Sequence, residues 1–307
     1  MEQELYKTRN VSKCVKAAYT LFNTNFKRIF SKLWLPFLVL SMLLAWNVKT
    51  YLQSLDIMTG AFLADNQSIV LYGIINLLTL VAYVWMLANV FHLLNVQGLR
   101  ANVIKIVKLL VTYMLIGIVI GVIVGAIAGG LAYYFKPSET TQPLVDGTWI
   151  LKVIGITGVI GVIIFLLLIP LYYVFMQFMI EDRKLRQLFF PSLKEGFRHW
   201  GFLFVIYFVI TLIALVFIGV IMMPVFVLVI SQVSALKSMA MGDPSGLPSY
   251  FGWLYFITFT VIYFIVFHFI TWALFVLYYA YGSIRRNEMD RESQKKELPN
   301  QTHSYQS

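Results

Sequence analysis

The sequence predicts an all-α, polytopic integral membrane protein with six transmembrane helices, and three observations support this. Hydrophobic residues make up 60% of the 307 residues and charged residues only 12%, whereas soluble globular domains average about 25% charged residues. The apolar residues are gathered into six long runs, and the basic residues alternate between the gaps. Long apolar runs indicate membrane helices because a helix satisfies its own backbone polar groups in lipid.

The six apolar runs define the expected spans. They are Leu33–Gln53, Ile69–Leu94, Leu109–Phe135, Val153–Ile180, Gly201–Ser231 and Phe251–Tyr281. Pro170 and Pro224 lie inside the fourth and fifth runs. Proline removes a backbone donor, so we expect each to kink its helix. A transport site at broken helices is the alternative, but the two prolines do not occupy matching positions.

Basic residues set the expected orientation. All but four of the 24 Lys and Arg residues lie in segments 1–32, 95–108, 181–200 and 282–307. Short loops rich in Lys and Arg stay in the cytoplasm, so we expect both termini there. The net charge of +10 is spread over short clusters rather than gathered in one soluble domain. This distribution argues against nucleic acid as a partner.

These patterns give three expected regions. Residues 1–32 form a cytoplasmic basic amphipathic segment, residues 33–281 the six-helix transmembrane domain, and residues 282–307 a disordered cytoplasmic tail. The tail is assigned as disordered because it is polar, charged and poor in apolar residues. Cys14, the single cysteine, is expected to be a small apolar residue of an amphipathic helix.

A basic amphipathic stretch precedes each odd-numbered span. Before the fifth, Leu193, Phe197, Trp200 and Phe204 recur at helical spacing and form one stripe. Ser192-Leu193-Lys194-Glu195 is typical of a capping box, which would begin a helix there. LFNTNFKRIFSKLWLPF (21–37) and GLRANVIKIVKLL (98–110) show similar stripes before the first and third spans. We expect three interfacial helices. Two explanations fit this pattern equally well. One is a threefold repeat of the same structural unit, and the other is the general preference of Lys and Arg for cytoplasmic segments.

Membrane lipids with anionic headgroups are the expected partners on the cytoplasmic side, because juxtamembrane Lys and Arg are attracted to an anionic leaflet. General anchoring is favoured over a specific headgroup site. The residues expected to contact headgroups are Lys27, Arg28, Lys105, Lys108, Lys194 and Arg198. A protein partner or a homodimer is also considered.

A glycine stripe is the strongest packing signal. Gly117, Gly121, Gly125 and Gly129 repeat every four residues in the third run, and Gly155, Gly158 and Gly161 share roughly one face of the fourth. Small residues allow membrane helices to approach closely. We therefore expect the third and fourth spans to form a tight hairpin at this glycine zipper. A homodimer through the stripe and a pore lining are the alternatives.

The sequence shows little catalytic chemistry. No two of the four histidines have a metal-ligand spacing, so neither a metal nor another cofactor is expected. The residues expected to line a polar seam between spans are Asn76, Asn89, His92 and His268. His268 lies near the centre of the sixth span, where ionisable residues are rare. Hydrogen bonding across helices is the expected role for its neutral ring.

The stretches LFNTNFKRIF and SLKEGFRHWGFLF, ahead of the first and fifth spans, bear a family resemblance. With the six-span layout, they resemble a loose group of bacterial inner-membrane proteins. That group includes the membrane domain attached to some glycerophosphodiester phosphodiesterases and related inner-membrane families. The resemblance implies a bacterial inner-membrane protein. Their phosphodiesterase domain has no counterpart after Tyr281, so no catalytic residues carry over.

Three functions are consistent with this sequence. The leading hypothesis is a non-enzymatic scaffold or accessory subunit embedded in lipid. The second is a transporter or channel for a small or lipidic solute, which would need a water-accessible cavity near Asn76, Asn89 and His268. The third is a membrane enzyme acting on lipid, with polar residues gathered at the inner interface. The candidates for that cluster are His92, Glu181, Asp182 and His199.

Overall fold

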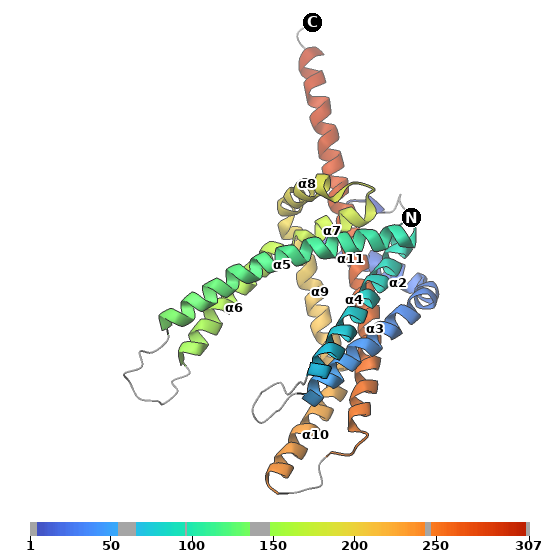
Figure 1. Cartoon of the computed structure of the whole chain (residues 1–307). Coiled ribbons are helices and arrows are strands. Elements are labelled where there is room, and N and C mark those ends of the chain that lie inside the picture. Colours follow the sequence, from blue (N-terminus) through green and yellow to red (C-terminus); the bar gives the residue numbers. More distant parts are fainter. Residues whose placement is uncertain (1–4, 55–65, 96, 136–147, 243–246, 305–307) are drawn as a thin grey trace. The chain divides into compact units, whose positions relative to one another are not determined.

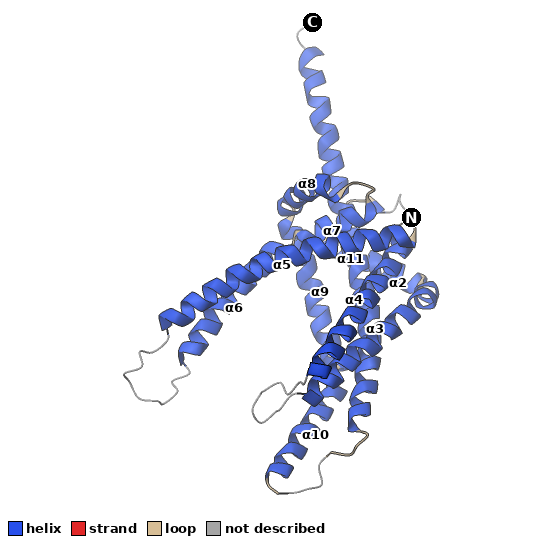
Figure 2. Cartoon of the chain, viewed as in Figure 1, coloured by secondary structure: helices blue, strands red, loops and turns tan. Residues whose placement is uncertain are grey.

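The computed structural model describes residues 5–54, 66–95, 97–135, 148–242 and 247–304. These residues form helices and no strand (Figures 1 and 2). Within them, six helices are long and apolar enough to cross a membrane: Phe26–Tyr51, Val70–Leu94, Leu99–Phe135, Trp149–Ile180, Trp200–Ile221 and Phe251–Gln294. The structure confirms an all-α polytopic membrane protein.

The chain divides into two compact units. The first contains residues 1–103 and 205–307, and the second contains residues 104–204. The first unit therefore combines the first two spans with the sixth and most of the fifth. The second holds most of the third span and the whole of the fourth. The threefold repeat considered from the sequence stays a prediction.

Helix α11 is the centre of the first unit. The helices of this unit are α2 (Val11–Thr24), α3 (Phe26–Ser54), α4 (Asn66–Leu94), most of α9 (Trp200–Ile221), α10 (Met223–Ala240) and α11 (Phe251–Ser304). Helix α11 packs against α2, α3 and α10, and α3 also packs against α4. The buried side chains of Ala45, Leu228, Tyr255 and Phe259 form one cluster of its apolar core.

The N-terminal segment is fastened to α11 beyond the sixth apolar run. Ser283 Oγ accepts a hydrogen bond from the Arg9 backbone N–H at 2.9 Å and donates to the Arg9 carbonyl at 3.0 Å. Thr8 Oγ1 donates to Asn287 Oδ1 at 3.3 Å, and Leu5 and Ile284 are buried. Helix α11 continues to Ser304. The expected boundary at residue 282 is therefore wrong, because the first turns of the supposed disordered tail are packed helix.

In the second unit, two side chains donate hydrogen bonds to carbonyls near the break between α6 and α7. It contains most of α5 (Leu99–Phe135), followed by α6 (Thr148–Leu168), α7 (Leu171–Ile180) and α8 (Leu185–Arg198). Tyr113 Oη donates to the Leu171 carbonyl at 2.7 Å, and Trp200 Nε1 donates to the Leu166 carbonyl at 2.9 Å. Both carbonyls flank the break between α6 and α7, where the helical hydrogen bonds are interrupted.

Proline breaks two apolar runs, as the sequence predicted. Pro170 caps the start of α7, and the fourth run is divided there into α6 and α7. Pro224 occupies the first turn of α10 and divides the fifth run after Met222. A proline in the first helical turn needs no N–H donor. Pro36, in contrast, lies within the continuous helix α3.

The interfacial stretches differ in detail from the prediction. A break at Asn25 separates α2 from α3, so α2 is a distinct helix before the first span. The stretch before the third span is the first part of α5 and not a separate helix. Helix α8 does precede the fifth span, but it begins at Leu185, and Ser192 Oγ donates to the Leu188 carbonyl at 2.6 Å. Ser192 therefore lies inside the helix, and the expected capping box is wrong.

The buried face of α8 also differs from the expected stripe. Leu188, Ser192 and Gly196 are buried, whereas Phe197 is exposed. Helix α8 packs against α7, and the Gly196 backbone lies so close to Pro170 that an added Cβ would be 3.0 Å from the proline Cβ. Small residues permit this close approach, so the larger aromatic residues remain outside.

The glycine seam is not formed in this structure. A methyl group added at any of the seven glycines would meet nothing within 4 Å; these are Gly117, Gly121, Gly125, Gly129, Gly155, Gly158 and Gly161. In α5, the partly buried residues instead follow an adjacent line, through Ile116, Ile120, Val124 and Ala128. The glycine stripe is thus on the open side of α5. Close packing of another molecule against this glycine stripe, as in the homodimer considered from the sequence, stays a prediction.

Candidate functional site

Two hollows of the first unit lie beside α2. Asn10 begins this helix by accepting a hydrogen bond from the Lys13 backbone N–H at 2.9 Å, which is a typical N-cap. Cys14 and Ala18, one turn apart, are completely buried. Their small side chains allow α2 to pack closely against α11, as expected for Cys14. Burial raises the pKa of the Cys14 thiol to about 11, and the nearby Arg9 charge opposes this shift.

Asn25 ends α2 and turns the chain into α3. Its side-chain amide donates to the Leu21 carbonyl at 2.9 Å, and its backbone N–H donates to the same oxygen at 3.2 Å. The Ile29 N–H then donates to the Asn25 carbonyl at 2.9 Å. Side chains that compete with the helical ladder in this way favour helix ends. The turn brings Arg28 and Ile29 close to the end of α2.

A basic groove runs along α2. It has a volume of about 440 Å³, and its lining residues are Arg9, Lys13, Lys16, Ala17, Thr20, Leu21, Thr24, Asn25 and Tyr279. Lys13, Ala17, Thr20 and Thr24 follow each other at steps of four, three and four, so one polar face of α2 forms most of the wall. Tyr279 of α11 also lines the groove.

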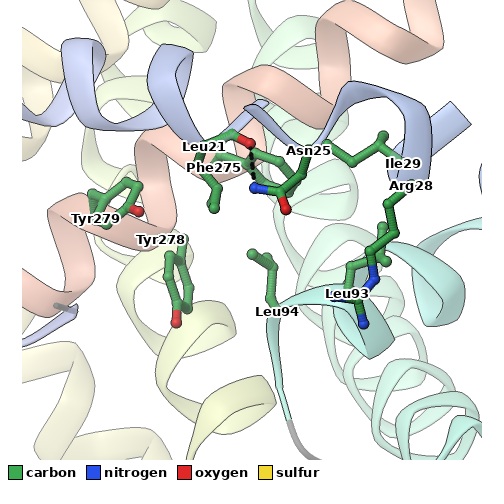
Figure 3. Close-up of a pocket in the computed structure, with 9 residues that line it drawn as sticks. All are labelled: Leu21, Asn25, Arg28, Ile29, Leu93, Leu94, Phe275, Tyr278 and Tyr279. Carbon is green, nitrogen blue, oxygen red and sulfur yellow. Dashed lines mark hydrogen bonds between the residues drawn. The ribbon is translucent and has the colours of Figure 1, made fainter. Parts of the chain in front are cut away.

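An apolar hollow adjoins the basic groove (Figure 3). It measures about 70 Å³ and is lined by Leu21, Asn25, Arg28, Ile29, Leu93, Leu94, Phe275, Tyr278 and Tyr279. Four helices, α2, α3, α4 and α11, contribute these residues. Figure 3 shows Leu94 pointing into the space between Asn25 and Tyr278, with Arg28 at the side next to Leu93. Leu21, Asn25 and Tyr279 line both cavities, so the two are neighbours that share part of their walls.

The charges around these cavities are all positive. Arg9, Lys13, Lys16 and Arg28 line one or the other, and no described Asp or Glu does. The Arg9 guanidinium donates to the Leu5 carbonyl at 2.9 Å and lies 4.8 Å from the centre of the Tyr279 ring. Lys13, Lys16 and Arg28 have no ion-pair partner among the described residues. An anion is therefore the complementary ligand for this site.

Sequence reasoning missed most of this site. Of its four cationic residues, only Arg28 was among the expected headgroup contacts. The missed signal is the polar face of α2, where Lys13, Lys16, Thr20 and Thr24 share one side behind the Asn10 cap. The aromatic wall could not be read from sequence, because Phe275 and Tyr279 lie more than 250 residues further along the chain.

Four of the other expected headgroup residues line neither of these cavities. Lys27, Lys108, Lys194 and Arg198 are exposed on their helices, which is compatible with contact to headgroups. Lys108 and Arg186 border a wide, mainly apolar groove between α5 and α8, lined also by Leu115 and Phe189. This second groove is more open than the cavities beside α2.

Lys105 does not face headgroups as expected. It is buried, and its ammonium group donates to the Glu181 carbonyl at 2.8 Å and lies 3.9 Å from the Asp182 carboxylate. The ammonium group also lies 5.5 Å from the centre of the Phe178 ring. The expectation for Lys105 is therefore wrong, because the end of α7 provides an internal partner that a charge pattern cannot reveal.

Each of the four residues expected to line the polar seam has a backbone carbonyl four or five residues away in the sequence as its hydrogen-bond partner. Asn76 donates to the Tyr72 carbonyl and Asn89 to the Trp85 carbonyl, each four residues earlier in α4. His92 Nδ1 lies 3.0 Å from the Gln97 carbonyl oxygen, and His268 Nδ1 lies 2.9 Å from that of Phe264. No hydrogen bond joins any two of these four residues. The structure therefore does not assemble a seam from them.

Aromatic rings surround His268. The centres of the Phe37 and Phe264 rings lie 4.8 Å and 5.0 Å from the imidazole centre, and the Phe30 ring is stacked at 5.8 Å. His268 Nε2 is buried and has no hydrogen-bond partner among the described residues. The expected hydrogen bond across helices is thus replaced by ring packing between α3 and α11.

The acidic residues considered for a lipid enzyme have structural partners. Glu181 Oε1 accepts from Gln177 Nε2 at 3.0 Å, and its other oxygen lies 3.4 Å from Arg183 Nε. Asp182 faces Lys105. In the described part of the chain, no three His, Cys, Asp or Glu side chains lie together in a way that could hold a metal ion.

Comparison of the chain with protein-family models, curated proteins and solved structures gives no match. Fold and site together define the class, which is a six-span, all-α membrane protein whose first unit has a basic groove and a neighbouring apolar hollow beside the start of α3 and the end of α4.

Proposed function

We propose that the protein is a non-enzymatic scaffold or accessory subunit embedded in lipid. The observation that supports this most directly is how little several spans bury within the chain. In the span Leu99–Phe135, no residue of the most apolar window is buried. In the span Trp200–Ile221, only 6% of the corresponding window is buried. Apolar faces of membrane helices that are not buried within their own unit contact lipid or other helices, including those of another protein.

The open face of α5 favours another protein. Gly117, Gly121, Gly125 and Gly129 lie on a side where an added methyl group meets nothing within 4 Å. Membrane helices associate through such small residues because their backbones can approach closely. A second copy of the chain or a different membrane protein fits this face equally well.

A transporter or channel is less well supported. Polar groups that line a transport path must face a water-filled space. Asn76 and Asn89 instead donate to their own helix, and His268 is enclosed by phenylalanine rings. These three residues were the ones expected to line such a path.

Photo-crosslinking in intact membranes tests the scaffold proposal. A photoreactive amino acid replaces Val122, which is 68% exposed on α5, or Val216, which is 67% exposed on α9. The matched control carries it at Leu109, which is buried on α5. We expect a discrete protein adduct from an exposed position and none from Leu109. Lipid adducts alone at both exposed positions, with only a monomer in native lipid discs, would contradict the proposal.

We also propose that both termini face the cytoplasm of a bacterial cell and that the chain lies in its inner membrane. The basic loops support this orientation. The contact between Arg9 and Ser283 joins the two end segments, which agrees with their lying on one side. A reporter that fluoresces only in the cytoplasm, fused after Ser307, should fluoresce. A periplasmic reporter at the same position that becomes active would contradict the orientation.

A further inference from the structure

The basic groove and the apolar hollow together have the character of an amphiphile site. The groove presents Arg9, Lys13 and Lys16, whereas the hollow presents mainly aliphatic and aromatic side chains. Leu21, Asn25 and Tyr279 belong to both walls, so the two cavities are neighbours, and we consider a ligand that extends over both. Such a ligand needs a negative charge at one end and an apolar part at the other.

The position of the hollow along the spans indicates its depth. Arg28 and Ile29 lie in the first turn of α3, and Leu93 and Leu94 are the last two residues of α4. These are the ends at which the first span begins and the second finishes. The hollow is therefore at the membrane boundary, level with headgroups and the first carbons of acyl chains.

We propose that these cavities form one specific site for an anionic glycerophospholipid. The headgroup phosphate binds in the basic groove between Lys13 and Lys16, within the field of Arg9. The glycerol and the first acyl carbons lie against Leu94, Phe275 and Tyr278, beside Arg28. This lipid-site proposal is independent of the proposed scaffold function.

The charge of the site selects a phosphate. Lys13 and Lys16 are one turn apart on α2, and their ammonium groups have no acidic partner in the described structure. Charge-assisted hydrogen bonds to phosphate oxygens are among the strongest polar contacts in proteins. Lysine also gains from proximity to an anionic leaflet, and both effects favour an anionic over a zwitterionic headgroup.

The hollow distinguishes a lipid from a soluble phosphate. Its wall is formed by large apolar side chains, and burial of each methylene group contributes about 0.8 kcal/mol in general. A volume of about 70 Å³ accommodates only a short apolar segment. The rest of each acyl chain remains in the bilayer, as the position at the membrane boundary allows.

Paired charge variants separate this site from general anchoring. The test variant is Lys13→Gln with Lys16→Gln, and the control is Lys32→Gln with Lys184→Gln. All four lysines are exposed, and the control pair lines neither cavity. Each double variant removes two positive charges, so long-range attraction to anionic lipid falls equally in both.

Native mass spectrometry of the full chain in detergent, titrated with phosphatidylglycerol or phosphatidylcholine of matched acyl chains, measures the binding. We expect one tightly retained phosphatidylglycerol and much weaker retention of phosphatidylcholine. The Lys13→Gln/Lys16→Gln variant should bind phosphatidylglycerol about 30-fold more weakly, since each lost hydrogen bond from a lysine to the phosphate weakens binding about fivefold. The control variant loses only the long-range attraction shared by both variants, so it should bind nearly as tightly as the unmodified protein. Equal weakening in both variants, or no preference between the lipids, would overturn the proposal.

A competition experiment on the unmodified protein tests the apolar part. Glycerol 3-phosphate carries the phosphate without acyl chains, and dihexanoyl phosphatidylglycerol adds two short ones. The short-chain lipid should displace the retained phosphatidylglycerol at concentrations where glycerol 3-phosphate has no effect. If both compete equally, the site recognises phosphate alone and the lipid assignment is wrong.

Discussion

Ser283 and Arg9 exchange two hydrogen bonds across 274 residues of sequence. The Ser283 hydroxyl accepts from the Arg9 N–H at 2.9 Å and donates to the Arg9 carbonyl at 3.0 Å. One side chain of α11 thus satisfies both backbone polar groups of a residue that lies outside any helix. This pair aligns the segment that leads into α2, and with it one wall of the basic groove.

Ser283→Ala should release the N-terminal segment from α11. The change leaves the N–H and carbonyl of Arg9 without these partners, and a buried polar group left unpaired costs about 1–3 kcal/mol. Ser293→Ala is the control, because Ser293 is exposed and bonds only to carbonyls of its own helix. Hydrogen exchange should rise at residues 5–10 in the first variant and not in the second. Unchanged protection in both would mean that apolar contacts alone hold this segment.

Gly282→Ala should disturb the same contact by crowding. A Cβ at this position would overlap the Leu5 carbonyl oxygen and lie 2.5 Å from Leu5 Cδ1. Overpacking costs about 1–3 kcal/mol, which exceeds the gain of up to about 1 kcal/mol from replacing glycine by alanine in a helix. We expect a lower midpoint of thermal unfolding and faster proteolysis near the N-terminus.

Gly121→Ala is the matched control for crowding. Its Cβ would meet nothing within 4 Å, so the thermal stability of the isolated chain should stay the same or rise slightly. If Gly121→Ala destabilised the monomer as much as Gly282→Ala, the open face of α5 would have to be closed by a neighbouring helix of the same chain.

Cys14 should make stability depend on alkaline pH. Burial raises the pKa of its thiol in the folded chain from 9.0 to about 11. The unfolded chain therefore loses this proton first as the pH rises. The thiol's contribution to stability is fully present below pH 9 and is lost as the pH rises to about 11.

Thermal unfolding of the unmodified chain and of Cys14→Ala, measured from pH 8 to pH 11, isolates this effect from the titration of other groups. The unmodified protein should lose stability more steeply than the variant above pH 9. Alkylation gives a second readout, because the thiolate is the reactive form. Cys14 should react slowly with iodoacetamide at pH 8 and rapidly after denaturation. Parallel pH curves together with rapid alkylation of the folded protein would show that Cys14 is accessible.

Local patterns predicted the spans well, because each depends on a property of contiguous residues. Hydropathy predicted six spans, and the breaks at Pro170 and Pro224 follow from the missing proline donors. The break at Asn25 was missed, since it depends on an amide that bonds to Leu21 rather than on a proline or glycine. The extension of α11 was missed because its polar turns are stabilised by the distant N-terminal segment.

The candidate site and the glycine stripe depend on long-range packing, which periodicity does not determine. Periodicity placed Gly117 and Gly121 on one face of a helix, but it could not say whether a neighbour lies against that face. It likewise placed Lys13 and Lys16 together without revealing the aromatic wall that α11 supplies. Charge alternation indicated which loops are basic, yet it assigned Lys105 to the lipid when its partner is within the protein.

Lys105→Met should loosen the contact between α5 and the end of α7. Methionine retains an apolar stem of similar length but removes the donor that reaches the Glu181 carbonyl at 2.8 Å. Loss of a hydrogen bond from a charged group costs about 1.5–3 kcal/mol, which should appear as a lower thermal midpoint and faster hydrogen exchange at residues 181–184.

Lys108→Met, one turn away on the exposed side of α5, should change stability by less than about 0.5 kcal/mol. Asp182→Asn should have a similarly small effect, because that carboxylate is 96% exposed and 3.9 Å from the ammonium group. Should Asp182→Asn match Lys105→Met instead, the ion pair and not the carbonyl contact would be the interaction that holds α5 to α7.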